Sequence, residues 1–189
     1  MLYLPLIAIR LEGEFLYVSS PYHPAFPRRA PTIGGKWMGW MERGRKEWMF
    51  DRRFEKEVRD LLVEIYGWDG TYPVLIADVL VELDRLPESW QDGQELWLLG
   101  RMLARRPGRD AFVRLGDGVA VKSGGFPESG GSRKYPALDW RTGTVLQVLD
   151  VPVTKIEAVQ RKYPEAVKEI PGTRRKVLGP DQVIPVQET

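Results

Sequence analysis

One amphipathic helix constrains the fold of this chain more than any other feature. Its apolar residues recur at the spacing that puts them on one helical face, namely Phe54, Val58, Leu61, Leu62 and Ile65. Asp51 is placed to cap the first turn, and Gly67 is placed to end the helix. The opposite face carries charges of both signs, as any solvated helix does, so the helix alone indicates no ligand.

Two predicted hairpins and a short helix precede this element. Alternating apolar residues over 7–18, with Glu12-Gly13-Glu14 as a turn, predict two short strands or one bent hairpin. Three prolines at 21, 24 and 27 leave room for at most a short helix before Gly34-Gly35. Residues 37–40 and 47–50 are typical of a second hairpin with a charged turn over 42–45.

From Tyr72 the sequence becomes β-like. Short apolar runs separated by Gly, Pro and Asp predict strands over 74–83, 96–104, 111–115, 119–122 and 144–151. Thr154-Lys155-Ile156-Glu157 has the form of a capping box that opens a helix. Pro164 breaks or restarts that helix, and Ala166, Val167 and Ile170 would continue its apolar face. A last strand over 183–186 is one alternative for the tail, and a loose segment is the other.

These patterns predict an α+β chain of two domains. Residues 1–67 form a small α/β module, and residues 68–189 form a β-rich, barrel-like domain with a C-terminal helix. The turn Trp68-Asp69-Gly70 is the expected boundary. Residues 68–100 hold seven acids and one base, whereas residues 101–141 hold nine bases and four acids. These blocks indicate distinct faces or domains, although solvated surfaces of a single domain would explain them equally well.

Composition excludes several classes of chemistry. The absence of Cys excludes disulfides, thiolate zinc sites and cysteine nucleophiles. No apolar run approaches the length of a membrane span, and the first residues lack the basic segment and cleavage site of a signal peptide, so we expect a cytoplasmic protein. Asn is also absent, which fits a thermophilic source.

The amino-terminal third mixes cations with indole rings. Residues 28–59 contain ten Lys or Arg and five Asp or Glu, with Trp37, Trp40, Trp48 and Phe50 among them. Cations neutralise phosphates and aromatic faces stack on bases, so this mixture favours a nucleic-acid surface. Trp48 and Phe50 are expected in the core beneath the helix. The expected binding residues are Arg28, Arg29, Lys36, Trp37, Trp40, Arg43, Arg45 and Lys46.

The order of elements over residues 15–66 resembles the HARP domain found beside the motor of annealing helicases. Phe15-Leu16-Tyr17-Val18 would be its strand, 25–30 its short helix, 46–50 the core of its tryptophan-bearing hairpin and 54–65 its closing helix. The resemblance implies binding of single-stranded or forked DNA without an activity of its own. Pro24 and Pro27 shorten the first helix, and no motor is attached, so remodelling of DNA would need a helicase or another replication or repair protein as partner.

A glycine-rich segment, 123–134, is the second candidate site. It fits neither the P-loop nor the dinucleotide fingerprint, but free N–H groups, serine hydroxyls and two cations could cradle a phosphate. A plain connection between strands is the alternative. The basic residues expected to act with it are Arg101, Arg105, Arg106, Arg109, Arg133 and Lys134.

The remaining polar residues offer weaker chemistry. His23 is the only histidine, which excludes a two-histidine metal site and favours a structural hydrogen bond. Six carboxylates could hold Mg²⁺ in principle, and three of them, Asp78, Glu82 and Asp84, are expected on one strand face; the other three are Asp110, Asp117 and Asp139. An acidic strand face exposed to solvent explains them equally well.

The sequence therefore predicts a non-enzymatic accessory protein that binds nucleic acid, DNA in preference to RNA, and needs no cofactor or metal. One alternative is a protein-binding adaptor or inhibitor that uses the acidic 68–100 segment and exposed tryptophans. A metal-dependent nuclease is the second alternative. No membrane partner is expected.

Overall fold

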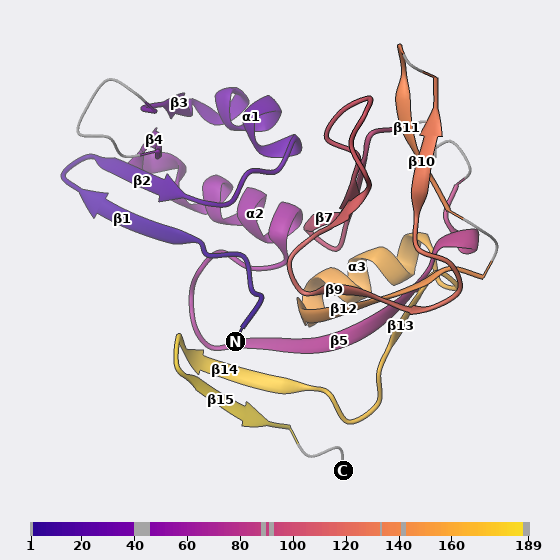
Figure 1. Ribbon diagram of the computed structural model, residues 1–189. Coiled ribbons are helices and arrows are strands. Elements are labelled where there is room, and N and C mark those ends of the chain that lie inside the picture. Colours follow the sequence, from indigo (N-terminus) through magenta and orange to yellow (C-terminus); the bar gives the residue numbers. More distant parts are fainter. Residues whose placement is uncertain are drawn as a thin grey trace.

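The computed structural model describes residues 2–39, 46–87, 90, 93–132, 134–140 and 143–186. It confirms the α+β class, with three α-helices and four separate sheets in these residues. Figure 1 shows the first sheet with its two helices at the upper left, and the largest sheet extending from below it to the right. The expected barrel is not found, because the sheets among these residues are open.

The first sheet is built from the two predicted hairpins. Its strand order is β1-β2-β4-β3 and every neighbouring pair is antiparallel. The strands are β1 (Ala8–Glu12), β2 (Phe15–Ser19), β3 (Lys36–Trp37) and β4 (Trp48–Asp51). Gly13 has a φ of 59° in the β1–β2 turn, a left-handed conformation that favours glycine. The turn expected over 42–45 lies outside the described residues.

Short helices pack on this sheet. They are α1 (Ala25–Arg29), η1 (Ala30–Ile33), η2 (Arg52–Phe54) and α2 (Glu55–Tyr66). Asp51 caps as expected, because its carboxylate accepts a hydrogen bond from the Arg53 amide at 2.9 Å. The expected apolar face of α2 is buried except at Phe54, which precedes the helix and remains 38% exposed. Phe50 is buried and Trp48 is half-buried, as expected of residues beneath α2.

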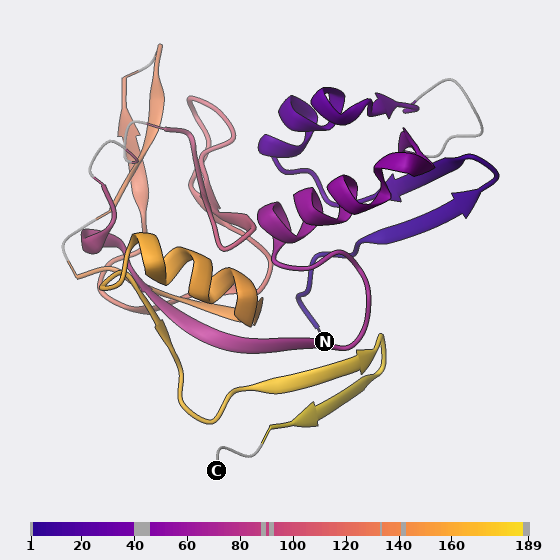
Figure 2. The same ribbon diagram turned by 180° about the vertical axis from the view of Figure 1, so that it is seen from behind.

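A larger sheet occupies the second half. Its order is β15-β14-β5-β12-β9, and β13 also pairs with β5. The strands are β5 (Val74–Glu82), β9 (Val119–Ser123), β12 (Val145–Pro152), β13 (Val167–Glu169), β14 (Arg175–Gly179) and β15 (Gln182–Pro185). The helix α3 (Val153–Lys162) packs on β5, β12 and β13, and it lies in front of the sheet in Figure 2.

Two small sheets complete the described fold. The run expected as one strand over 96–104 is a hairpin of β6 (Glu95–Leu98) and β7 (Arg101–Arg105), with β8 (Arg114–Leu115) beside β7. Leu99 and Gly100 both have positive φ, which turns the chain inside this apolar run. Part of the glycine-rich segment is also strand, since β10 (Glu128–Gly131) pairs with β11 (Pro136–Asp139).

Two expectations around α3 are wrong. The helix begins where predicted, but Thr154 is not its cap, because its hydroxyl donates to the Gly67 carbonyl at the end of α2. The chain after Pro164 does not return to helix. Residues 167–169 instead form β13, whose pairing with β5 satisfies their backbone groups.

The described residues hold two apolar cores. The first gathers apolar residues of 4–68 together with Ile76 and Val177, and the second gathers apolar residues of 77–167. Trp68, expected at the boundary, is buried in the first core and donates to the Pro5 carbonyl at 3.2 Å. The last hairpin, β14–β15, thus contributes to the core of the amino-terminal module, while its position below β5 is visible in Figure 1.

Candidate functional site

The amino-terminal candidates among the described residues lie on α1, on β3 and just before β4. Lys36 and Trp37 form β3 at the edge of the first sheet, and Lys46 comes just before β4. The pairing of Trp37 with Trp48 and the hydrogen bond from the Met38 amide to the Glu47 carbonyl bring these segments together. Three further candidates, Trp40, Arg43 and Arg45, lie outside the described residues.

Trp37 is half-exposed and held in place. Its side chain is 49% exposed, and its ring centroid lies 5.5 Å from that of Trp48 at an interplanar angle of 55°. A Cβ at Gly39 would lie 1.9 Å from the indole nitrogen of Trp37, so the ring rests directly on this glycine. Contacts on one side fix the ring and leave the remainder open to a ligand.

The cations of this region divide into paired and unpaired groups. Arg29 has both guanidinium arms on Glu64 of α2, one of them at 2.7 Å, and this contact raises the pKa of Arg29 and lowers that of Glu64. On α2 and its first turn, Arg53, Lys56 and Arg59 likewise hold ion pairs. Arg28, Lys36 and Lys46 are exposed and have no ion pair with any described residue. We define these three cations and Trp37 as the β3 surface.

In the second half, Arg106 has a structural role. Its guanidinium donates to the backbone carbonyls of Gly130 and Arg109, which ties the loop after β7 to β10. Arg109 is paired with Asp110 at 2.7 Å. Arg105 is exposed at the end of β7, and Lys134 is exposed with its ammonium 5.3 Å from the Tyr135 ring centroid. Arg133 lies outside the described residues.

Arg101 is not available to an anion. Its two terminal nitrogens donate to the carbonyls of Leu149 and Asp150 at 3.0 Å each, and burial lowers its pKa to about 10. This arginine stabilises the irregularity within β12, where the register shifts between Val148 and Val151.

In the glycine-rich segment, several of the polar groups that could bind a phosphate are already hydrogen-bonded within the protein. The Ser129 hydroxyl donates to the Ala111 carbonyl, and the Ser132 hydroxyl accepts from the Tyr135 amide at 3.1 Å. The Ser132 amide donates to the Tyr135 carbonyl, so this turn bonds to itself. The hydroxyls of Ser129 and Ser132 therefore already have backbone partners, one in the loop after β7 and one in the hairpin turn.

Exposed aromatic residues near this hairpin were not anticipated from the sequence. Phe112 is 88% exposed and Tyr135 is 68% exposed. Phe112 follows Ala111, whose carbonyl is bonded to β10, and Tyr135 lies in the β10–β11 turn. The basic residues near them along the chain, Arg109 for Phe112 and Lys134 for Tyr135, were the signal available, but no periodicity distinguishes such rings from core residues.

His23 belongs to a row of rings that crosses between the two halves. Its imidazole lies 4.8 Å from Trp97 of β6 and 5.8 Å from Tyr66 of α2. Burial, with a smaller effect of Lys155, lowers its pKa to about 4, and its Nδ1 accepts from the Ala25 amide. The structural hydrogen bond expected of His23 is therefore present. The row runs through Trp37, Trp48, Phe26, Tyr66, His23, Trp97 and Tyr22.

The carboxylates expected on one strand face are separated. Asp78 is buried on β5, Glu82 ends β5 and pairs with Lys168, and Asp84 lies beyond the strand in η3 (Leu83–Arg85), where it accepts from the Gly143 amide. In the described part of the chain, no three His, Cys, Asp or Glu residues are arranged to hold a metal ion. Asp110 is in the ion pair with Arg109, and Asp117 and Asp139 are exposed.

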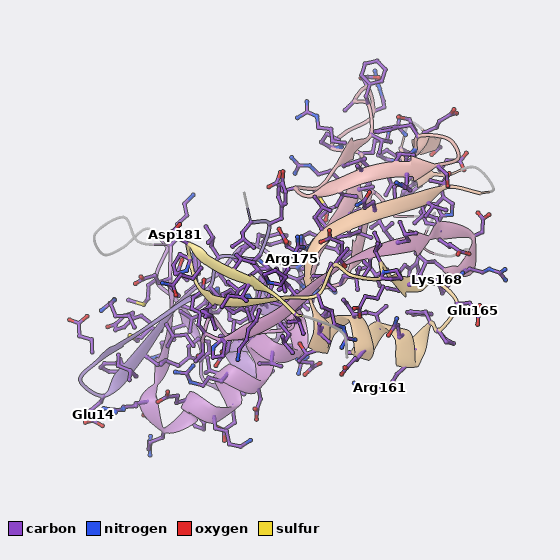
Figure 3. The ribbon with its side chains drawn as sticks, turned by 90° about the horizontal axis from the view of Figure 1, so that it is seen from below. Glu14, Arg161, Glu165, Lys168, Arg175 and Asp181 are labelled. Atoms are coloured by element: carbon purple, nitrogen blue, oxygen red, sulfur yellow. The ribbon has the colours of Figure 1, made fainter. Side chains whose placement is uncertain are left out.

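Asp78 instead joins a buried ionic cluster that sequence patterns did not reveal. One Arg175 nitrogen bonds both Asp78 and Asp150, the latter at 2.8 Å, and the Asp150 amide donates to Asp78 at 3.0 Å. The Tyr3 amide donates to the other oxygen of Asp150 at 2.8 Å. Figure 3 labels Arg175 near the centre of the molecule, where a cavity of about 260 Å³ adjoins it. The cluster joins four distant parts of the chain.

The tryptophans of the acidic segment are not strongly exposed. Trp68 is buried, Trp90 is half-buried against Tyr163, and Trp97 is half-buried against His23. An adaptor surface over residues 68–100 would therefore depend on the acids rather than on these rings.

Comparison of the chain with known protein families, with curated proteins and with solved structures gives no match. Among the described residues, no helix is long and apolar enough to cross a membrane.

Proposed function

We propose that this chain is a non-enzymatic accessory protein that binds single-stranded nucleic acid through the β3 surface. The observation that supports this proposal most is the half-exposed ring of Trp37, which has Lys36 beside it on β3 and Lys46 just before the paired strand β4. Neither lysine has an ion pair with a described residue. Lys36 and Lys46 would neutralise phosphates, and Trp37 would stack on an unpaired base.

The fixed position of Trp37 adds to this argument. A ring that rests on Gly39 and Trp48 loses little side-chain freedom when a base stacks on its open part. Because a stacked ring reads no hydrogen-bond pattern, sequence preference would be slight. Arg29 is not included among the phosphate-binding cations of this proposal. It is paired with Glu64, and a phosphate would have to displace that carboxylate first.

The HARP-like order of elements supports DNA rather than RNA as the ligand, and forked DNA as one form of it. The same resemblance suggests a helicase or another replication or repair protein as partner in the cytoplasm. A protein-binding adaptor stays as the alternative to this function.

Fluorescence anisotropy with a labelled oligothymidylate, in the full chain, tests the proposal. Wild type should bind, and the Lys36→Glu/Lys46→Glu variant should lose most of that affinity. Arg161→Glu is the matched control, because Arg161 is an exposed cation on α3, labelled in Figure 3, outside the β3 surface. Equal binding by wild type and the double variant would contradict the proposal.

Ionic strength separates phosphate contacts from other forms of binding. Each neutralised phosphate contributes about −0.7 to the slope of log affinity against log salt for single strands. The double variant should therefore have a shallower slope by roughly 1.4, provided residual binding is measurable. Affinity that does not change with salt would exclude the electrostatic part of the proposal.

A further inference from the structure

The loop after β7 and the β10–β11 hairpin form one pre-organised projection. Arg106 bonds the carbonyls of Gly130 and Arg109, and the Ser129 hydroxyl bonds the carbonyl of Ala111 at 3.3 Å. The loop therefore runs alongside β10 and is attached to it at successive positions. Figures 1 and 2 show the loop and the hairpin extending in the same direction from the body of the molecule.

Two aromatic side chains stand on this projection with most of their surface in water. Phe112 is 88% exposed and Tyr135 is 68% exposed, whereas most other aromatic rings of the described residues are buried or half-buried. The Tyr135 backbone is fixed on both sides by Ser132. Exposure of large rings on a rigid support is typical of a surface that meets a ligand.

Exposed cations lie on the elements that carry these rings, and so do the exposed acids Glu128 and Asp139 of the hairpin. Arg105 and Arg114 are exposed on paired positions of β7 and β8, and Lys134 has its ammonium beside the Tyr135 ring. Arg109 adds a further guanidinium, although Asp110 pairs with it. Cations interleaved with stacking rings suit a sugar-phosphate backbone with unpaired bases better than an apolar peptide.

We propose that Phe112 and Tyr135 form a second base-stacking site, at which a single strand already held by the β3 surface makes a further contact. Lys134 and Arg105 would neutralise its phosphates there. This inference depends on the proposed function in one respect, since it takes the ligand of both surfaces to be the same strand. In Figure 1, α1 and the hairpin both lie on the upper side, opposite β14–β15.

The test compares two surfaces and two lengths of oligothymidylate. The Phe112→Ala/Tyr135→Ala variant should bind a long oligonucleotide more weakly by roughly 5- to 150-fold for each stacked base that is lost. A short oligonucleotide that covers one surface should lose less. Tyr135→Phe, which keeps the ring, should bind as wild type does.

Phe15→Ala is the matched control. Phe15 is 42% exposed at the β1–β2 turn, and its neighbour Glu14, labelled in Figure 3, marks that turn at the far end of the molecule from β10–β11. Its loss should leave affinity unchanged. Photocross-linking of an iodouridine-substituted strand, mapped by mass spectrometry, should place adducts on Phe112 or Tyr135.

The outcomes separate this inference from the function on which it depends. If the Phe112→Ala/Tyr135→Ala variant binds the long strand as wild type does while Lys36→Glu/Lys46→Glu does not, the second site is wrong and the proposed function stands. If both variants weaken binding and Phe15→Ala does not, both proposals are supported. If wild type binds no oligonucleotide of either length, both are overturned.

Discussion

At the scale of single residues, the burial of the His23 ring makes the stability of the fold depend on its protonation. Its ring packs between Trp97 and Tyr66, and Lys155, itself partly buried with a lowered pKa, disfavours a second positive charge nearby. The neutral imidazole is the form that this environment accepts. Protonation of His23 is therefore unfavourable because its ring is packed between the two halves of the chain.

His23 should make folding less stable in acid. Its pKa is about 4 in the folded chain and about 6.5 when unfolded, so its contribution is complete above pH 6.5 and is lost as pH falls through 4. Because the ring is only partly buried, we expect about 1–2 kcal/mol rather than the full shift. Urea unfolding of wild type and His23→Gln from pH 7 to pH 4 measures it. Parallel curves for the two proteins would contradict this prediction.

Residue types alone predicted several positions correctly. Phe50 is buried and Asp51 caps the helix, because both follow from local pattern. The pairing of Arg29 with Glu64 could not be predicted, since 35 positions separate them and many cations compete for each acid. The same holds for Arg106, whose acceptors are backbone carbonyls that any residue type provides.

At the scale of elements, the junction between α2 and α3 depends on one glycine. Gly67 ends α2 with a φ of 88°, and a Cβ there would lie 2.7 Å from the Lys155 Cβ and 2.8 Å from the Pro152 Cβ. The Gly67 carbonyl also accepts from the Thr154 hydroxyl. The end of one helix and the start of the other therefore meet at a position without room for a side chain.

Gly67→Ala should cost about 2–4 kcal/mol of stability, because the positive φ and the close contacts both oppose a Cβ. Gly34→Ala is the control: φ is 79° there, but the nearest atom would be 3.8 Å away. The Gly34→Ala variant should lose about 1 kcal/mol of unfolding free energy, because only the positive φ opposes the new Cβ there. Thermal or urea unfolding measures both variants, and equal losses would show that the contact with α3 adds nothing.

Elements with strong local patterns were predicted well, and short ones were not. The apolar spacing of α2 and the turn of β1–β2 are local signals, and both elements form where expected. β10 contains two glycines and β13 has only three residues, so neither has enough alternation to indicate a strand. The capping box failed because Thr154 found an acceptor 87 residues away.

At the scale of the whole molecule, Arg175 links the ends of the chain to its middle. It neutralises Asp78 of β5 and Asp150 of β12, and Asp150 in turn accepts from the Tyr3 amide. Pairing of β14 with β5 could not be predicted from sequence, because strand order over such a separation has no local signal. Without that pairing, the sequence places Asp78 either in a magnesium site or on an acidic strand face exposed to solvent, whereas Asp78 is buried.

Arg175→Met should destabilise the chain by about 2–4 kcal/mol, because two buried carboxylates would lose their shared cation. Replacing the carboxylates as well, in Arg175→Met/Asp78→Asn/Asp150→Asn, should recover part of the loss. The midpoint of urea unfolding measures both. A triple variant no more stable than Arg175→Met would contradict the electrostatic explanation.

The place of β14 against the first core has a consequence for biosynthesis. Val177 completes a core whose other members lie in residues 4–76, so a ribosome must translate the intervening segment before that core can close. Until then the nascent amino-terminal module would expose apolar surface. Asp78 and Asp150 would also lack their counter-ion, Arg175. Chaperones that hold nascent chains therefore have a long interval in which to act on this protein.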